Sequence, residues 1–251
     1  MLDYALELVR LQENGDLTAV EIAEKALASV RDTHDSINAF THVAAEQALD
    51  AARRVDAKRA AGEPLGILAG VPVAVKDVLC TADMPTTCSS RMLKNFRPPY
   101  DATVVSKLRD ADAVIIGKTN MDEFAMGAST ETSAFGLTRN PWDTNRTPGG
   151  SSGGAAACVA AGSASSLDQV GPMAWSVPDV ALLLEAIAGF EPRDSTSLNQ
   201  IVPKYSDVLQ SSDLRGLRIG VLSETEESAG IDPAIMDAVN EAAKVFQSQG
   251  A

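Results

Sequence analysis

The chain is poor in the residues that build metal centres and disulfide frameworks. Its 251 residues include three cysteines and two histidines. The cysteines (Cys80, Cys88 and Cys158) are odd in number and lack the paired spacing of a zinc site. We therefore expect no bound metal, and a reducing compartment such as the cytoplasm.

Positive charge is also scarce. The chain carries 21 lysines and arginines against 34 aspartates and glutamates, which gives a net charge of −13. Proteins that bind nucleic acid directly cluster basic residues, because these neutralise the phosphates. We expect a partner to hold any RNA that takes part in the function.

Long apolar runs are missing as well. No stretch approaches the roughly 20 consecutive apolar residues that cross a bilayer. The N-terminus lacks the basic region and apolar run of an export signal. The sequence therefore predicts a soluble, unexported protein without a membrane partner, and 45% hydrophobic residues suffice for a sizeable core.

A glycine- and serine-rich stretch is the most distinctive feature of the chain. Residues 147–154 read Thr-Pro-Gly-Gly-Ser-Ser-Gly-Gly, and small residues fill positions 155–162. Glycines allow a sharp bend, and the alanine-rich run favours a closely packed helix. Ser151 and Ser152 should therefore lie where free N–H groups favour an anion or a developing oxyanion. The alternatives are a flexible linker and a phosphate loop, although the Gly-Lys-Ser/Thr ending of that loop is absent.

The first quarter of the chain has the apolar spacing of helices. Thr18 and Glu21 form a capping box at the start of one of them. A further alanine-rich helix is expected over residues 44–61. Residues 1–62 are therefore predicted to form an all-helical N-terminal arm.

The pattern changes after residue 62 to short apolar runs rich in β-branched residues. Such runs, bounded by glycine and proline, are typical of strands buried on both faces. Helical segments alternate with them, which predicts an α/β core with a mostly parallel or mixed sheet over residues 63–251. The expected strands are residues 68–78, 113–118 and 218–222, and the expected helices are 101–109, 180–188 and 233–249.

Lys76 is the anomaly of the first of these strands. Burying a lysine is costly unless it is paired or neutral, and a neutral amine can act as a base. The more common alternative for a lone lysine is that it pairs with Asp77 or extends its charge to solvent. Further along, composition alone favours core positions for Phe124 and Met126.

Together these motifs resemble the amidase signature family. Lys76 stands in Val-Ala-Val-Lys-Asp, and Ser151 stands in Pro-Gly-Gly-Ser-Ser-Gly-Gly. Residues 118–127, 140–143 and 165–173 are similar to one branch of that family, the A subunits of glutamyl-tRNA(Gln) amidotransferases. The resemblance runs through nearly the whole chain and implies an amidase-signature fold, a mixed sheet flanked by helices.

The resemblance implies a Lys/Ser/Ser mechanism. Lys76 would be the base, and Ser151, preceded by a cis peptide bond, would relay its action to a second, nucleophilic serine. A positioned base makes a hydroxyl nucleophilic, and nearby N–H groups stabilise the oxyanion. Met126 and Gly127 would contact the substrate, glutamine.

The same resemblance implies partners. A B subunit would use the released ammonia, with ATP and Mg²⁺, to amidate glutamate on tRNA, and a C subunit would complete the heterotrimer. The chain itself would need no cofactor and would reach tRNA only through its partner. The alternatives are a stand-alone amidase of the same family and a non-catalytic paralogue that binds a partner.

The chain departs from the family pattern after Gly162. In the family, a Gly-Ser-Asp-x-Gly-Gly-Ser segment with the nucleophile and oxyanion hole, and then a core strand, precede Ser-Ser-Leu-Asp-Gln. Here Ser163 leads straight into Ser165 and Ser166, and none of these has paired glycines beside it. We expect residues 1–251 to be a partial amidase domain, truncated and internally deleted. It should lack the nucleophile, be inactive and fold poorly, because a central strand would lack a neighbour.

Overall fold

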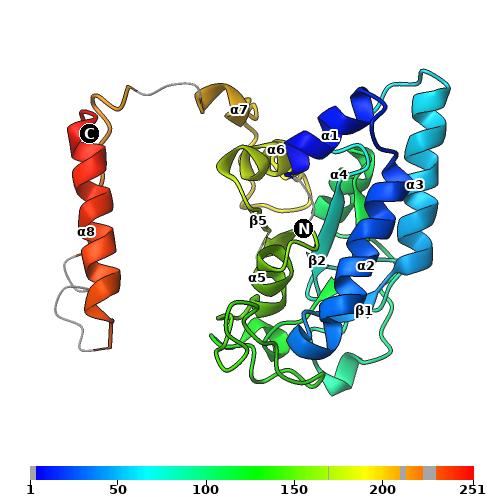
Figure 1. Cartoon of the computed structure of the whole chain (residues 1–251), viewed down its shortest axis with the longest axis horizontal. Helices are drawn as coiled ribbons and strands as arrows, with labels where there is room; N and C mark the ends of the chain where they lie inside the picture. The colour runs from blue at the N-terminus through cyan, green and yellow to red at the C-terminus, as the bar shows by residue number, and fades with distance from the viewer. Residues whose placement is uncertain (1–3, 169, 210–212, 223–229) are drawn as a thin grey trace. The chain divides into compact units, whose positions relative to one another are not determined.

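The chain forms two compact units, Met1–Pro203 and Lys204–Ala251. The computed structural model describes residues 4–168, 170–209, 213–222 and 230–251, and Figure 1 shows their helices and strands. The first unit holds the sheet and every motif singled out above. The second holds the C-terminal helix.

Helices of the first unit begin where the sequence places capping residues. The Thr18 hydroxyl accepts from the Glu21 N–H at 3.1 Å, and the Glu21 carboxylate accepts from the Thr18 N–H at 2.8 Å, so the predicted capping box is confirmed. Ser176 caps a later helix by accepting from the Asp179 N–H at 3.2 Å. The helices are α1 (Ala5–Glu13), α2 (Ala19–Ile37), α3 (Ala45–Ala60), α4 (Thr103–Asp110), α5 (Gly153–Ala160) and α6 (Val177–Ile187), with short 3-10 turns η1 (Arg91–Leu93) and η2 (Glu123–Ala125).

The sheet is mixed, as the sequence predicts. Its strand order is β1-β3-β2-β4-β5. The central strand β2 runs parallel to β3 and β4, whereas the outer strands pair antiparallel. Parallel strands end at one edge of a sheet, so the carboxyl ends of β2 and β3 lie together. The strands are β1 (Phe40–Val43), β2 (Pro72–Lys76), β3 (Val114–Thr119), β4 (Ser165–Asp168) and β5 (Gly171–Met173).

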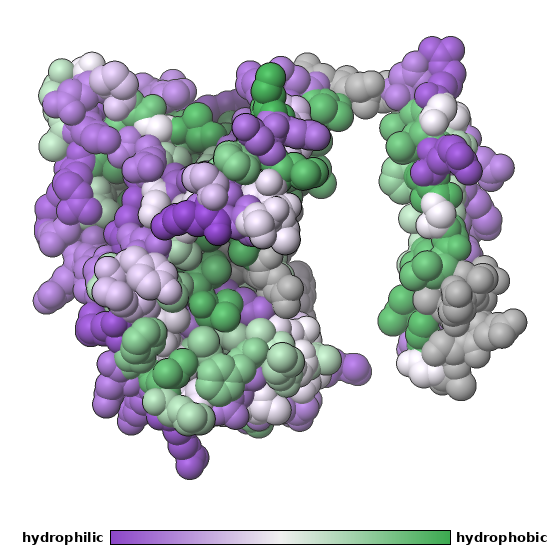
Figure 2. All heavy atoms as spheres, turned by 180° about the vertical axis from the view of Figure 1, so that it is seen from behind, coloured by the Kyte–Doolittle hydropathy of each residue, from purple (hydrophilic) through white to green (hydrophobic). Residues whose placement is uncertain are grey.

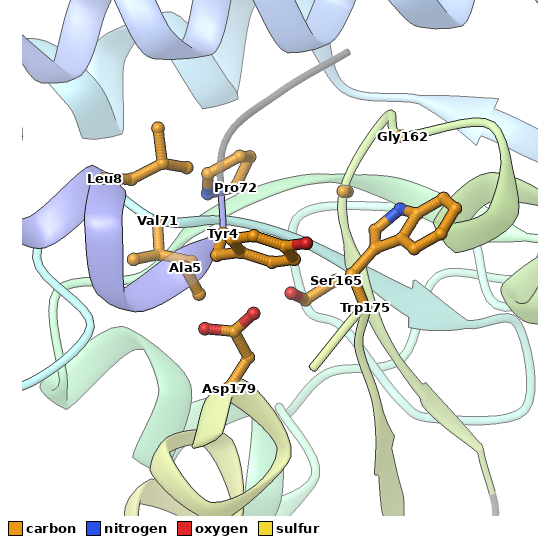
Figure 3. Close-up of a pocket in the computed structure, with 10 residues that line it drawn as sticks. Tyr4, Ala5, Leu8, Val71, Pro72, Gly162, Ser165, Trp175 and Asp179 are labelled. Atoms are coloured by element: carbon orange, nitrogen blue, oxygen red, sulfur yellow. The ribbon is translucent and has the colours of Figure 1, made fainter. Parts of the chain in front are cut away.

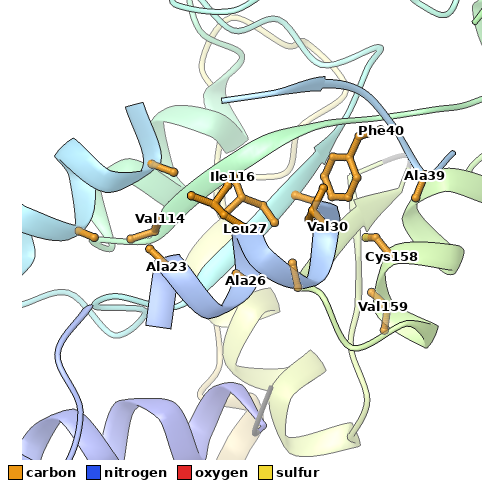
Figure 4. Packing of buried hydrophobic residues seen from close by; sticks show 14 of the residues in the cluster. Ala23, Ala26, Leu27, Val30, Ala39, Phe40, Val114, Ile116, Cys158 and Val159 are labelled. Atoms are coloured by element: carbon orange, nitrogen blue, oxygen red, sulfur yellow. The ribbon is translucent and has the colours of Figure 1, made fainter. Parts of the chain in front are cut away.

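Helices cover both faces of this sheet. One core cluster joins α2, α3 and α5 to Ala74 of β2 and to Val114 and Ile116 of β3, as Figure 4 shows for part of it. The other cluster joins α1, α4 and α6 to Val73 and Val75. Because side chains alternate along a strand, Lys76 belongs to the face of Ala74, which α5 covers.

The N-terminal segment is not all-helical, contrary to the sequence-based expectation. Residues 40–43 form β1, which pairs antiparallel with β3. Asn38 ends α2 in a left-handed conformation (φ 54°), and the Phe-Thr-His-Val stretch after it suits a pleated, half-buried surface. The arm is therefore built into the sheet.

The expectation of a central strand without a neighbour is also wrong. β4 begins at Ser165, immediately after the junction at residues 162–165, and pairs parallel with β2 (Val73 with Ser165, Val75 with Leu167). β3 pairs with the other edge of β2. Both edges of β2 therefore have partners for their backbone groups.

The second unit contains α7 (Tyr205–Val208) and α8 (Pro233–Ser248). The predicted helix at residues 233–249 is confirmed, and Asp232 caps it by accepting from the Ala234 N–H at 2.9 Å. The strand expected at residues 218–222 is wrong: these residues form neither a strand nor a helix. Apolar side chains such as Ile235 and Val239 are exposed along α8 (Figure 2). None of the described helices combines the length and apolar character needed to cross a membrane.

Candidate active site

Lys76 and Ser151 lie together, although 75 positions separate them in the sequence. Lys76 ends β2 and its side chain is fully buried. Its Nζ donates to Ser151 Oγ at 3.0 Å. Burial rules out the alternative of a lysine extended into solvent, and Asp77 pairs with Lys118. The two predicted catalytic residues therefore form a contact that one proton can cross.

The loop that carries Ser151 needs its glycines for space. The Gly150–Ser151 peptide bond is cis, as the resemblance implied. A Cβ on Gly150 would lie 2.3 Å from Asp122 Oδ2, and one on Gly154 would lie 2.4 Å from the carbonyl oxygen of Asn120. The loop and the first turn of α5 thus press against the chain that leaves β3. This fixed, buried packing also excludes the flexible-linker interpretation.

Asp122 and Thr130 hold the backbone on each side of Ser151. The Asp122 N–H donates to the Ser151 carbonyl oxygen at 3.0 Å. The Thr130 hydroxyl donates to the Gly149 carbonyl oxygen at 2.9 Å and accepts from the Gly153 N–H at 3.0 Å. Sequence reasoning missed both residues, because nothing in their own spacing indicates contact with a loop that follows 19 to 29 positions later.

The Asp122 carboxylate fixes the backbone segment that holds the Ser151 loop. It accepts from the N–H groups of Ser129 (3.2 Å), Thr130 (2.9 Å) and Thr132 (3.3 Å), and from the Thr132 hydroxyl (2.9 Å). Burial opposes its ionisation, but these hydrogen bonds outweigh that effect and hold the pKa of Asp122 below its usual 3.8. The charged Asp122 side chain therefore holds in place the segment that packs against the Ser151 loop.

We expect Asp122→Asn to destabilise the first unit by about 3 kcal/mol. Both carboxylate oxygens accept hydrogen bonds, so the amide NH₂ of asparagine would face donors and leave buried N–H groups unpaired. Urea unfolding at neutral pH measures the loss. The exposed Asp35 of α2 provides the matched control, since Asp35→Asn should change stability by less than about 0.5 kcal/mol.

The pKa of Asp122 also determines the direction in which the stability of the fold changes with pH. Its pKa in the folded state lies below 3.8, the unfolded value. Its contribution is therefore present above pH 3.8 and is lost as the pH falls through the lower, folded-state pKa. The Asp122→Asn variant should lack this part of the acid sensitivity, and an unchanged acid profile with equal stability would contradict the assigned role.

Comparison with known proteins agrees with this geometry. The family model for amidases matches residues 21–165 and 162–251. The chain belongs to the amidase family. The two matched segments meet at residues 162–165, between α5 and β4.

Three of the similar proteins show what this chain resembles within the family. It is 53% identical to the A subunit of glutamyl-tRNA(Gln) amidotransferase from Rhodopirellula baltica, over 100% of this chain and 58% of the relative. The solved structure of the Thermotoga maritima counterpart gives a TM-score of 0.78 at 32% identity, covering 93% of this chain and 57% of that one. A bacterial aryl acylamidase of the amidase signature enzymes gives 0.90 at 27% identity, covering 99% and 60%. The amidase-signature fold is thus established, and the chain spans about 58% of the length of the curated relative.

A buried ion pair involves Asp77, the residue that follows Lys76. Lys118 Nζ on β3 lies 3.3 Å from Asp77 Oδ1, and both side chains are fully buried. Lys118 also donates to the Leu79 carbonyl oxygen and the Thr86 hydroxyl, each at 2.8 Å, and Asp77 accepts from the Thr87 N–H at 3.1 Å. Burial lowers the pKa of Lys118, and Asp77 opposes part of that shift. The pair ties the end of β2 and the following loop to β3.

Met126 and Gly127 lie on the surface loop after η2. Met126 is 82% exposed and Phe124 is 42% exposed, so the core positions expected for them are wrong. The backbone is anchored, since the Phe124 N–H donates to the Cys88 carbonyl oxygen at 3.0 Å, and the side chains point outward. Gly127 packs against Asp122, where a Cβ would come within 2.3 Å of Cγ. A role in binding substrate stays a prediction.

The serines after the junction have other surroundings. Ser163 is buried, with its Oγ 3.0 Å from the Ser29 Oγ. Ser165 lines a small pocket with Tyr4, Trp175 and Asp179 (Figure 3). The Ser166 side chain lies outside the described residues.

The described residues offer no evident metal centre. Among them, no group of three or more His, Cys, Asp or Glu side chains is placed to hold a metal ion. Cys80, Cys88 and Cys158, all within the described ranges, are not joined in disulfides.

Proposed function

We propose that this chain is the glutamine-hydrolysing subunit of a tRNA-dependent amidotransferase, which converts Glu-tRNA(Gln) to Gln-tRNA(Gln). The observation that carries the proposal is the 3.0 Å hydrogen bond between buried Lys76 and Ser151, in a chain 53% identical to a protein named for that reaction. Lys76 acts as the base that takes the proton of Ser151, and Ser151 in turn activates a nucleophilic hydroxyl.

We infer that the segment bearing that nucleophile is absent. The alignment with the Rhodopirellula baltica relative is 291 residues long and includes all 251 residues of this chain, so at least 40 positions of the relative lack a counterpart. The family match is divided at residues 162–165. Only four residues separate the end of α5 at Ala160 from the start of β4 at Ser165. We expect the chain to hydrolyse glutamine at the uncatalysed rate.

Restoring the segment tests this proposal. The corresponding residues of the relative, inserted between Gly162 and Ser163, should raise ammonia release from glutamine well above background. The matched control is the same insert with its serines changed to alanine, which should stay at background. Equal turnover by the parent chain and the restored chain would contradict the assigned absence, and no turnover by a folded restored chain would contradict the glutaminase function.

The proposal includes partners by analogy with the named relatives. B and C subunits would complete the enzyme in the cytoplasm, with ATP and Mg²⁺ used by the partner that receives ammonia. A stand-alone amidase is the second candidate, because the TM-score to the aryl acylamidase (0.90) exceeds that to the amidotransferase subunit (0.78). Hydrolysis of aryl acylamides in preference to glutamine by the restored chain would favour it.

We expect the purified chain not to bind tRNA measurably at physiological salt. With 21 basic against 34 acidic residues, it has too little positive charge to displace counterions from the phosphates. Filter binding at several salt concentrations measures this, with a basic tRNA-binding protein as the positive control. Salt-dependent binding at submicromolar concentration would show that the chain contacts tRNA without a partner.

A further inference from the structure

The Lys76–Ser151 contact remains complete in this chain even without a second serine. Lys76 is fully buried, whereas Ser151 is partly exposed, so reagents can reach the hydroxyl while the amine is shielded. We propose that Ser151 is itself a nucleophile that accepts an acyl group from small activated acyl donors, such as aryl esters, with Lys76 as its base. The inference rests on the site of the proposed function and does not require glutamine as the substrate.

The backbone around Ser151 is set up for such a reaction. The Asp122 N–H and the Thr130 hydroxyl fix the loop, so little freedom is lost when an acyl donor approaches. The first N–H groups of α5 are occupied, since Gly153 donates to Thr130 Oγ1 and Gly154 donates to the Asn120 carbonyl oxygen.

Two neighbouring N–H groups are left for the reacting carbonyl. Within the described part of the chain, no hydrogen-bond acceptor lies on the N–H of Gly150 or of Ser151. The Ser151 N–H lies in the peptide unit directly before the reacting residue, and the Gly150 N–H lies in the unit before that. Such groups stabilise the negative charge that develops on a carbonyl oxygen under attack. The geometry therefore supplies a base, a nucleophile and donors for the oxyanion.

The chemistry of the step sets which donors can react. The Ser151 O–H proton passes to Lys76 Nζ while Oγ bonds to the acyl carbon. The ester C–O bond then breaks, and the aryl oxide leaves with its electron pair. An aryl oxide leaves without a proton, whereas the amine of an amide must be protonated as it leaves and is the poorer leaving group. We therefore expect aryl esters to acylate Ser151 in the parent chain, although this chain is not expected to turn over glutamine.

The test uses the parent chain with p-nitrophenyl acetate. Release of p-nitrophenolate is followed at neutral pH, and the acetyl group is located by peptide mapping. We expect one acetyl group on Ser151, removable by hydroxylamine, which cleaves esters and spares the amides formed on surface lysines. Ser151→Ala should abolish this label. Lys76→Met and Lys76→Arg should each slow its formation by at least about 100-fold, since a general base contributes roughly 10²–10⁴.

Two matched variants separate the dyad from nonspecific reaction. Ser163→Ala removes a buried hydroxyl bonded to Ser29, and Lys107→Met removes an amine that donates to the Ile187 and Ala188 carbonyl oxygens. Both should label at Ser151 like the parent. The inference is overturned if Ser151 carries no hydroxylamine-sensitive acetyl group, or if a folded Lys76→Met variant labels at the parent rate. Glutamine turnover by the restored chain is a separate readout, so either proposal can fail alone.

Discussion

Replacing Lys76 with methionine or arginine in the chain with the restored segment should reduce glutamine hydrolysis on the order of a millionfold, the loss found when the nucleophile or base of subtilisin is removed. Methionine fills a similar volume but offers no base. Arginine keeps the positive charge but cannot be deprotonated in a protein. Ammonia release at neutral pH gives kcat/KM for each variant.

Lys107→Arg is the control for this experiment. Its amine caps the end of α6 from α4 and lies outside the dyad, so its arginine variant should keep normal turnover. Thermal unfolding by circular dichroism verifies that the Lys76 variants fold. Near-normal activity of a folded Lys76→Arg enzyme would remove Lys76 from the role of base.

Asp77→Asn should destabilise the first unit by about 3–5 kcal/mol, because it leaves the buried Lys118 ammonium without its counter-charge. Both side chains are fully buried, so water cannot compensate. Urea unfolding followed by tryptophan fluorescence measures the change, and Trp142 and Trp175, the two tryptophans of the chain, both report on this unit.

Two further variants help to interpret the stability change measured for Asp77→Asn. The double replacement Asp77→Leu with Lys118→Met removes both charges and should cost less than the single change, since buried pairs replaced by apolar residues are often near neutral. The exposed pair Arg53–Asp50 is the surface comparison within the first unit, and Asp50→Asn should change stability by less than about 1 kcal/mol. A loss below about 1 kcal/mol for Asp77→Asn would show that the pair does not hold β2 to β3.

Elements with strong local signals were predictable. The capping box of Thr18 and Glu21 starts α2 where expected, and the apolar runs around Lys76 and Lys118 form β2 and β3. Short strands could not be predicted from local signals. Residues 40–43 became β1 because β3 offers them an edge, whereas residues 218–222 have a strand pattern but form no strand. Strand formation depends on the neighbour as much as on the pattern.

The candidate site was likewise predictable from the sequence only in part. Residue types and motifs were enough to single out Lys76 in its apolar strand and Ser151 between glycines, and their resemblance to the amidase family is confirmed. Met126 was misplaced in the core, because hydrophobicity alone does not tell which side of an anchored loop faces solvent.

By itself, the sequence determined the signature residues, the bend that the glycines permit and the family. Only the tertiary structure decided that Lys76 and Ser151 touch, that Asp122 and Thr130 brace the loop, and that Lys118 neutralises Asp77. Each of these contacts joins residues far apart in the chain at distances near 3 Å. Hydrogen bonds and ion pairs weaken steeply beyond such distances, so they depend on the order of β2, β3 and β4 and on the packing of α5, which no local pattern encodes.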